Sequence, residues 1–223
     1  MAGEPEVEGE APMEIHAPHG PVHSFREFLL QLLTITCGVL IALGLEGAVQ
    51  RQHHRHLVSE SAANLAMEIR ANRDALEDGL GQMGQTQAQL GNILAVVRKL
   101  QADRTAKPGA TTLTISVMSM RVTAWNTAGG TGALGLMEYG DVARYTRIYN
   151  LQQQFMDAHR KALDALLELE SYGPLLQGSY KRSSDAQGIE AERAVGRAMA
   201  ATNIARDVGK ALDAEYKDYL GGK

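Results

Sequence analysis

The run FLLQLLTITCGVLIALGL, residues 28–45, is the stretch that decides the fold. Its eighteen residues carry no formal charge. At about 1.5 Å per residue, a helix of this length covers roughly 27 Å, which matches the hydrocarbon thickness of a bilayer. The apolar stretch continues to residue 49 if Glu46 is tolerated. We therefore predict a transmembrane anchor over residues 25–50.

A buried core helix or a cleaved secretory signal could also give an apolar run of this kind. A signal needs a basic leader, a shorter apolar core and a small-residue cleavage site. Here the leader is acidic, with glutamates at positions 4, 6, 8, 10 and 14, and Arg26 is the one basic residue before the run. No clean A-x-A site follows the run. The sequence favours a membrane span over both alternatives.

Small and polar residues recur at helical spacing along one stripe of the predicted anchor. They are Gln31, Thr34, Gly38 and Ala42. Such side chains let helices approach closely and form hydrogen bonds in lipid, so this stripe is a candidate helix-association face. The equal alternative is that a moderately apolar span simply tolerates them.

A polar collar follows the run, and we expect it at the membrane interface. Its residues are Glu46, Arg51, His53, His54, Arg55 and His56. Contact with lipid headgroups, or titration near pH 6.5, accounts for the cluster. A metal shared by the first and third histidines would need a further ligand that is not found nearby. An intramembrane role for the glutamate is the less favoured alternative.

Composition limits the remaining possibilities. Residues 1–24 hold five glutamates and four prolines. The segment has too few apolar groups to offset the entropy of ordering, so we predict a disordered acidic tail. His16, His19 and His23 lie in this tail and are expected to be solvated. A net charge of -4 argues against a nucleic-acid partner. Cys37 is the single cysteine, which excludes an intramolecular disulfide.

Three further stretches show apolar residues at helical spacing: residues 59–102, 141–172 and 185–220. Asp141 is the expected N-cap of the second stretch. Residues 114–128 are ambiguous, because their β-branched residues favour a strand while their alanine-rich end favours a helix, and we choose the helix. The predicted fold is all-α: an N-terminal transmembrane helix followed by an antiparallel helical bundle of three to four helices, with the bundle domain at residues 51–222.

No recognisable catalytic motif occurs in the chain. Gly130, Gly132 and Gly135 match G-x-G-x-x-G, but no βαβ pattern surrounds them, so we predict a turn. Trp125 and Asn126 lie in an uncharged stretch and form a possible ligand pocket, although a core position for the tryptophan is favoured. We predict no enzyme activity, no cofactor and no metal.

Two blocks of the sequence resemble a set of uncharacterised bacterial single-span membrane proteins. The first is GVLIAL at residues 38–43 with Glu68, Ile69 and Asn72 of an E-I-x-x-N element, and the second is TAWNTAGGTGAL followed by Tyr145 and Tyr149. The resemblance covers about residues 26–160 and implies a bacterial inner-membrane protein with an extracytoplasmic C-terminal domain. The acidic leader departs from the basic leaders of that family, and the arginines flanking the run weakly favour a cytoplasmic domain, so both orientations stay open.

These patterns predict a membrane-anchored helical interaction or scaffold module. Its expected partners are the lipid bilayer, further copies of the chain through the transmembrane and bundle helices, and an unidentified protein. A ligand-sensing helical bundle of the bacterial envelope is the alternative function.

Overall fold

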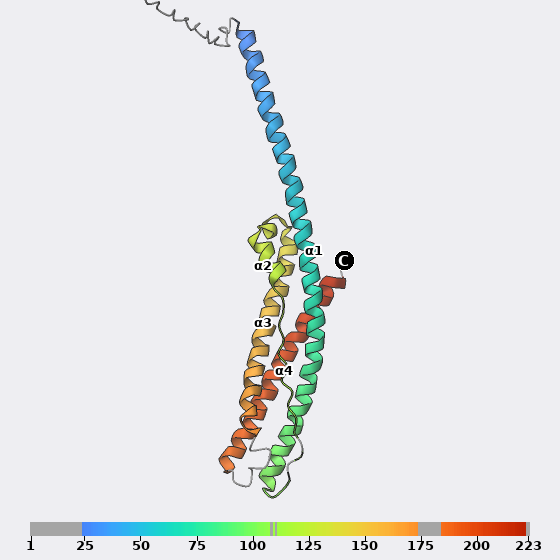
Figure 1. Ribbon diagram of the computed structural model, residues 1–223, viewed down its shortest axis with the longest axis vertical. Helices are drawn as coiled ribbons and strands as arrows, with labels where there is room; N and C mark the ends of the chain where they lie inside the picture. The colour runs from blue at the N-terminus through green and yellow to red at the C-terminus, as the bar shows by residue number, and fades with distance from the viewer. Residues whose placement is uncertain (1–23, 108, 110, 174–183, 222–223) are drawn as a thin grey trace, which may run out of the picture. The chain divides into compact units, whose positions relative to one another are not determined.

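The computed structural model describes residues 24–107, 109, 111–173 and 184–221. Its elements are the helices α1 (Phe25–Ala102), α2 (Thr123–Gly130), α3 (Tyr139–Glu170) and α4 (Asp185–Gly221), with the short 3-10 helix η1 (Ala133–Leu136) (Figure 1). Across these residues the structure has no strand. The prediction of an all-helical chain is confirmed, whereas the predicted tail lies outside the described residues except for Ser24.

The chain divides into two compact units, Met1–Gln52 and His53–Lys223. In the first unit, every residue of α1 from 25 to 46 is exposed. An 18-residue window of α1 has a mean hydropathy of 2.3, and none of it is buried. Within the described part of the chain, α1 is the one helix long and apolar enough to cross a membrane.

α1 continues without a break from the apolar run into the amphipathic stretch that was expected to begin near residue 59. The helix also continues through Gly79, Gly81 and Gly84. Gly79 marks a close contact, because a Cβ atom built there would overlap the terminal methyl group of Met118. The neighbour at this glycine is an irregular segment rather than another helix.

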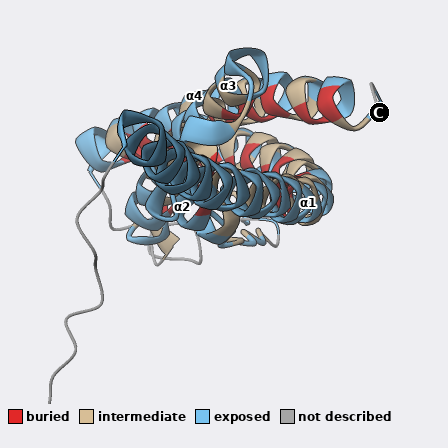
Figure 2. Ribbon diagram, turned by 90° about the horizontal axis from the view of Figure 1, so that it is seen from above, coloured by how far each residue is buried: buried red, intermediate tan, exposed pale blue. Residues whose placement is uncertain are grey.

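The second unit is organised around buried apolar side chains from α1, α3 and α4, which form stripes along these helices (Figure 2). One cluster is built around Leu65, Ile69, Leu76, Ile148, Phe155, Leu212 and Tyr216. A second cluster contains Leu90, Val97, Leu166, Ala194 and Val195. Alanine and glycine line much of the buried face of α4, which lets α3 and α4 pack closely.

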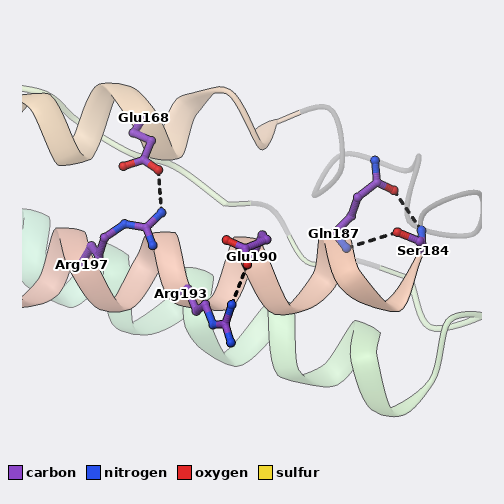
Figure 3. Close-up of polar contacts among 6 residues, drawn as sticks. All are labelled: Glu168, Ser184, Gln187, Glu190, Arg193 and Arg197. Carbon is purple, nitrogen blue, oxygen red and sulfur yellow. Dashed lines mark hydrogen bonds and ion pairs between the residues drawn. The ribbon is translucent and has the colours of Figure 1, made fainter.

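Ion pairs show that α4 runs antiparallel to both α1 and α3, because residue numbers rise along one partner while they fall along α4. The pairs are Arg73–Asp213 at 3.4 Å and Arg98–Glu192 at 2.8 Å from α1, and Arg144–Asp218 at 2.7 Å and Glu168–Arg197 at 2.5 Å from α3. Figure 3 shows the last pair. All of these pairs lie at or near the surface, so each contributes little to stability and serves here as a marker of direction.

α1 and α3 run parallel, since residue numbers rise together along them. Tyr149 bonds to Glu68 and Gln152 bonds to Asn72. The two helices can run parallel because residues 111–122, which we call the strap, return along α1 in an irregular extended conformation. The helix predicted over residues 114–128 is therefore wrong before Thr123, where α2 begins.

Alternating burial explains why the strap is extended. Leu113, Ile115, Met118 and Met120 are partly buried, while Thr114, Val117 and Ser119 between them are exposed. An alternation close to two residues matches an extended chain that lays one edge on a core. The β-branched residues of this stretch were the signal for it.

The first turns of α3 and α4 are capped differently. Ser184 and Gln187 form a capping box before α4, with the Gln187 N–H donating to Ser184 Oγ at 3.3 Å and the Ser184 N–H donating to Gln187 Oε1 at 2.9 Å (Figure 3). Asp141 was predicted to be the N-cap of α3, but the N-cap is Glu138, without a side-chain bond. Asp141 lies instead in the first turn, where its charge favours the helix dipole.

Two glycines of α4 provide a matched test of the core. A Cβ atom built on Gly209 would lie 2.9 Å from Leu80 Cδ2 and 2.9 Å from Phe155 Cε2, whereas nothing lies within 4 Å at Gly196. We expect Gly209→Ala to lower the free energy of unfolding by about 1–3 kcal/mol through overpacking. Gly196→Ala, on the exposed face, should raise it by up to about 1 kcal/mol through helix propensity. Urea unfolding measures both, and equal effects of the two substitutions would contradict the close packing at Gly209.

Candidate functional site

Side chains from the helices, rather than another strand, hold the backbone of the strap. Asn72 of α1 makes the strongest connection: its Oδ1 accepts from the Arg121 N–H at 2.8 Å, and its Nδ2 donates to the Arg121 carbonyl oxygen at 2.8 Å. Asn72 is 1% exposed. Its amide thus pairs with both backbone groups of one residue, as a neighbouring strand would.

Two more points of attachment lie nearer the beginning of the strap. Gln89 Oε1 accepts from the Thr114 N–H at 2.8 Å, and Thr86 Oγ1 lies 3.2 Å from the Thr114 carbonyl oxygen. His159 of α3 accepts the Met118 N–H on its Nε2 at 3.3 Å. The strap is therefore fixed at residues 114, 118 and 121 by side chains from two helices.

Glu68 of α1 caps the beginning of α2 from outside that helix. Its Oε2 accepts from the Ala124 N–H at 2.9 Å, while the N-cap residue Val122 offers no side-chain bond. A carboxylate at this position satisfies an unpaired N–H and favours the helix dipole. The other oxygen accepts from the Tyr149 hydroxyl at 2.7 Å. Burial, together with this bond to Glu68, raises the pKa of Tyr149, so its hydroxyl stays protonated and remains a donor.

The network continues across the core to α4. Gln152 Nε2 donates to the Arg121 carbonyl oxygen at 3.0 Å, and Gln152 Oε1 accepts from the Tyr216 hydroxyl at 2.7 Å. Both side chains are nearly fully buried, and burial also raises the pKa of Tyr216. One connected set of hydrogen bonds therefore joins α1, the strap, α3 and α4.

A groove of about 510 Å³ lies over Glu68, between α1 and α2. Its polar lining comprises Ser61, Asn64, Glu68, Arg121, Thr123 and Thr127. Most of these groups sit at an exposed rim, while the carboxylate of Glu68 lies at a buried position and is already bonded on both oxygens. The groove offers hydrogen-bond donors and acceptors for a polar partner. Among the described residues, no three His, Cys, Asp or Glu side chains are placed to hold a metal ion.

The two residues of the predicted ligand pocket lie beside this groove and do not line it. Trp125 packs against the core and stacks on Tyr149, with ring centroids 4.9 Å apart and an interplanar angle of 20°. Asn126 is exposed. The groove is lined instead by their neighbours Ala124, Thr127 and Ala128.

All four residues of the predicted helix-association face lie on α1 and are exposed: Gln31, Thr34, Gly38 and Ala42. The Thr34 hydroxyl donates to the Leu30 carbonyl oxygen at 2.9 Å, which satisfies its proton within the helix. No atom lies within 4 Å of a Cβ built at Gly38. This stripe of the first unit is therefore open along its length in the described part of the chain.

The predicted collar is helical and exposed throughout. Its members are Glu46, Arg51, His53, His54, Arg55 and His56, all within α1. Arg51 Nε donates to the Gly47 carbonyl oxygen at 3.0 Å, and His56 Nε2 lies 3.9 Å from Glu60 Oε2. These contacts stay within about one turn of the same helix, so the collar is open to the surroundings of α1.

The two hydrogen bonds between the Asn72 side chain and the Arg121 backbone, which we call the clamp, can be tested with a paired substitution. Asn72→Ala removes the acceptor of the Arg121 N–H and one of the two donors to the Arg121 carbonyl oxygen, and we expect it to lower the free energy of unfolding by about 1–3 kcal/mol. Hydrogen exchange at the Arg121 amide should accelerate, as measured by NMR. Asn64→Ala, at an exposed position on the same helix, is the control and should change neither quantity. An unchanged Arg121 exchange rate in Asn72→Ala would show that the clamp does not hold the strap.

No family model, curated protein or solved structure matches this chain in comparisons with known proteins. The resemblance to bacterial single-span proteins therefore stays a prediction.

Proposed function

We propose that this chain is a single-span membrane protein whose helical bundle acts as an interaction module, assembled as an oligomer. The observation that carries the proposal is the exposed apolar run of α1. Leu33, Leu40 and Ile41 are 59%, 62% and 65% exposed, and their apolar neighbours along the run are exposed as well. A helix that is apolar on all sides needs a membrane or another protein to cover it.

A bilayer fits this run better than a core does. A helix satisfies its own backbone hydrogen bonds, so it can stand in lipid without a partner. A core helix of a soluble protein would have these side chains buried, and none of the window is buried here. The collar that follows the run supplies the polar and basic side chains typical of an interface.

The second unit supports the interaction role. α3 and α4 pack around a common core with the second part of α1, and the groove over Glu68 combines polar groups with exposed apolar side chains. Met67 lines the groove with 59% of its surface exposed. A rim of mixed chemistry suits a protein partner. The net charge of -4 makes a nucleic acid an unsuitable one.

We propose a bacterial inner membrane as the cellular setting, with the bundle outside the cytoplasm. This part of the proposal rests on the resemblance to bacterial single-span membrane proteins. A reporter fused to the C-terminus measures which side the bundle occupies, and a cytoplasmic reporter would reject the extracytoplasmic arrangement.

A ligand-sensing bundle is the second candidate function, and the groove beside Trp125 favours it. Because this is the single tryptophan, its fluorescence reports on the surroundings of Trp125 in α2. A small polar ligand that fills the groove should change that fluorescence saturably. A protein partner without such a ligand favours the interaction module.

The anchor is tested by placing charges in the apolar run. Leu33→Arg with Leu40→Arg should move the chain from the membrane to the soluble fraction, because each arginine near the middle of a span costs about 3 kcal/mol on insertion scales. The control is Leu167→Arg with Ile204→Arg, at residues of α3 and α4 that are 57% and 60% exposed. Carbonate extraction and fractionation measure the partition. Retention of the first double variant in the membrane would contradict the proposed span.

Self-association through the anchor is tested by cysteine cross-linking in a Cys37→Ser background. Gly38→Cys places a thiol on the candidate face, and Leu40→Cys places one about 200° away around the helix. We expect oxidation in membranes to produce a covalent dimer from the first variant and little from the second. Equal cross-linking at both positions would contradict a specific face.

A further inference from the structure

A small cavity lies where α1, the strap, α3 and α4 meet. Its volume is about 20 Å³, and its polar lining consists of Thr86, Ser116, His159 and Thr202. The remaining lining is apolar or glycine, including Gly79, Met83 and Leu166. A cavity of this size has room for one water molecule but not for a larger ligand.

Two buried polar atoms at this cavity have no hydrogen-bond partner among the described residues. They are His159 Nδ1 and Thr202 Oγ1. His159 is 5% exposed and Thr202 is 2% exposed, so bulk water does not reach them freely. Buried polar atoms in folded proteins are almost always paired with protein or with ordered water. These two atoms therefore point to an occupant of the cavity.

The strap determines which nitrogen of His159 carries the proton. The Met118 N–H donates to His159 Nε2 at 3.3 Å, and a nitrogen that accepts a hydrogen bond cannot itself be protonated. Burial lowers the pKa of His159, which keeps the ring neutral near pH 7. The proton of the neutral ring must then lie on Nδ1. His159 Nδ1–H is consequently a donor at the cavity.

Two hydroxyl groups around the cavity are acceptors. The Thr86 hydroxyl donates to the Gln82 carbonyl oxygen at 3.1 Å or to the Thr114 carbonyl oxygen at 3.2 Å, and Ser116 Oγ donates to Gln82 Oε1. With their protons directed to these acceptors, both oxygens have lone pairs for a further hydrogen bond. The Thr202 hydroxyl has no partner among the described residues and can donate or accept.

We propose that this cavity is a binding site for one structural water molecule. The water accepts from His159 Nδ1–H, shares a hydrogen bond with the Thr202 hydroxyl, which can donate or accept, and directs a proton to the oxygen of Thr86 or Ser116. Three hydrogen bonds are typical of a buried water. The water joins α3 to α4 behind the strap, and it maintains the tautomer of His159 that receives the Met118 N–H.

Other occupants fit less well. A metal ion would find one imidazole and hydroxyl groups, without a second histidine, cysteine or carboxylate in the lining. An apolar guest would leave both unpaired polar atoms unsatisfied. The donor on His159 and the acceptors opposite it match water.

NMR of the full chain in lipid nanodiscs, labelled with ¹⁵N-histidine, tests the proposal. The ring nitrogen shifts of His159, assigned by their loss in His159→Gln, report the tautomer. We expect protonated Nδ1 and a cross-peak between its proton and the water resonance, with the sign of a long-lived bound water. The cross-peak should be lost in Thr202→Val, which keeps the shape of the side chain, and retained in Thr202→Ser, which keeps the hydroxyl.

Several results would overturn the water site. An Nε2-protonated ring would remove the donor from the cavity, and a cross-peak from the ring N–H to the Thr202 hydroxyl in place of water would show a direct hydrogen bond. A ring N–H that exchanges too fast to observe would show a site open to bulk solvent. If Thr202→Val does not fold, the wild-type spectrum and Thr202→Ser still decide, because the wild-type water cross-peak and its persistence in the serine variant are both required.

Discussion

The pair of hydrogen bonds between Asn72 and the backbone of Arg121 is the constraint on which the second unit depends. An extended segment beside helices has no strand to pair with, and its buried backbone groups still require partners. The Asn72 amide supplies one donor and one acceptor, as a peptide group would. This match fixes the register of the strap, which in turn places Met118 over Gly79 and brings the Ala124 N–H to Glu68.

The direction of the helices follows from the strap. Because residues 111–122 return along α1, α3 begins beside the part of α1 that enters the unit and then runs parallel to it. Tyr149 and Gln152 of α3 therefore meet Glu68 and Asn72 in the same order along the chain. The two sets of buried hydrogen bonds, around Glu68 and around Asn72, both form because a single extended segment aligns two helices. Removing one member would take away a hydrogen bond from each of its neighbours in a region of low dielectric constant.

The sequence predicted the long helices well because their pattern is local. Apolar spacing near 3.6 residues predicted a helix over residues 185–220, and α4 is Asp185–Gly221. The strap was missed because its cause is not local: β-branched residues indicated an extended chain, but no second strand was available to pair with it. Asn72 was noted in the sequence only as part of the E-I-x-x-N element, and its partner is a backbone 49 residues away. Glu68 caps α2, which begins at Thr123 and not at the predicted residue 114.

The burial along α1 argues for two different surroundings of one helix. Residues 25–46 are exposed on every side although most are apolar, whereas from Leu65 onward buried residues recur on one face only. The helix itself does not change between these two parts, because α1 is continuous from Phe25 to Ala102. What changes is burial: the apolar side chains of residues 25–46 are exposed, whereas those from Leu65 onward are buried along one stripe. The stripe is covered by α3 and α4, whereas the apolar side chains of residues 25–46 have no cover among the described residues, and this difference is the basis of the proposed anchor.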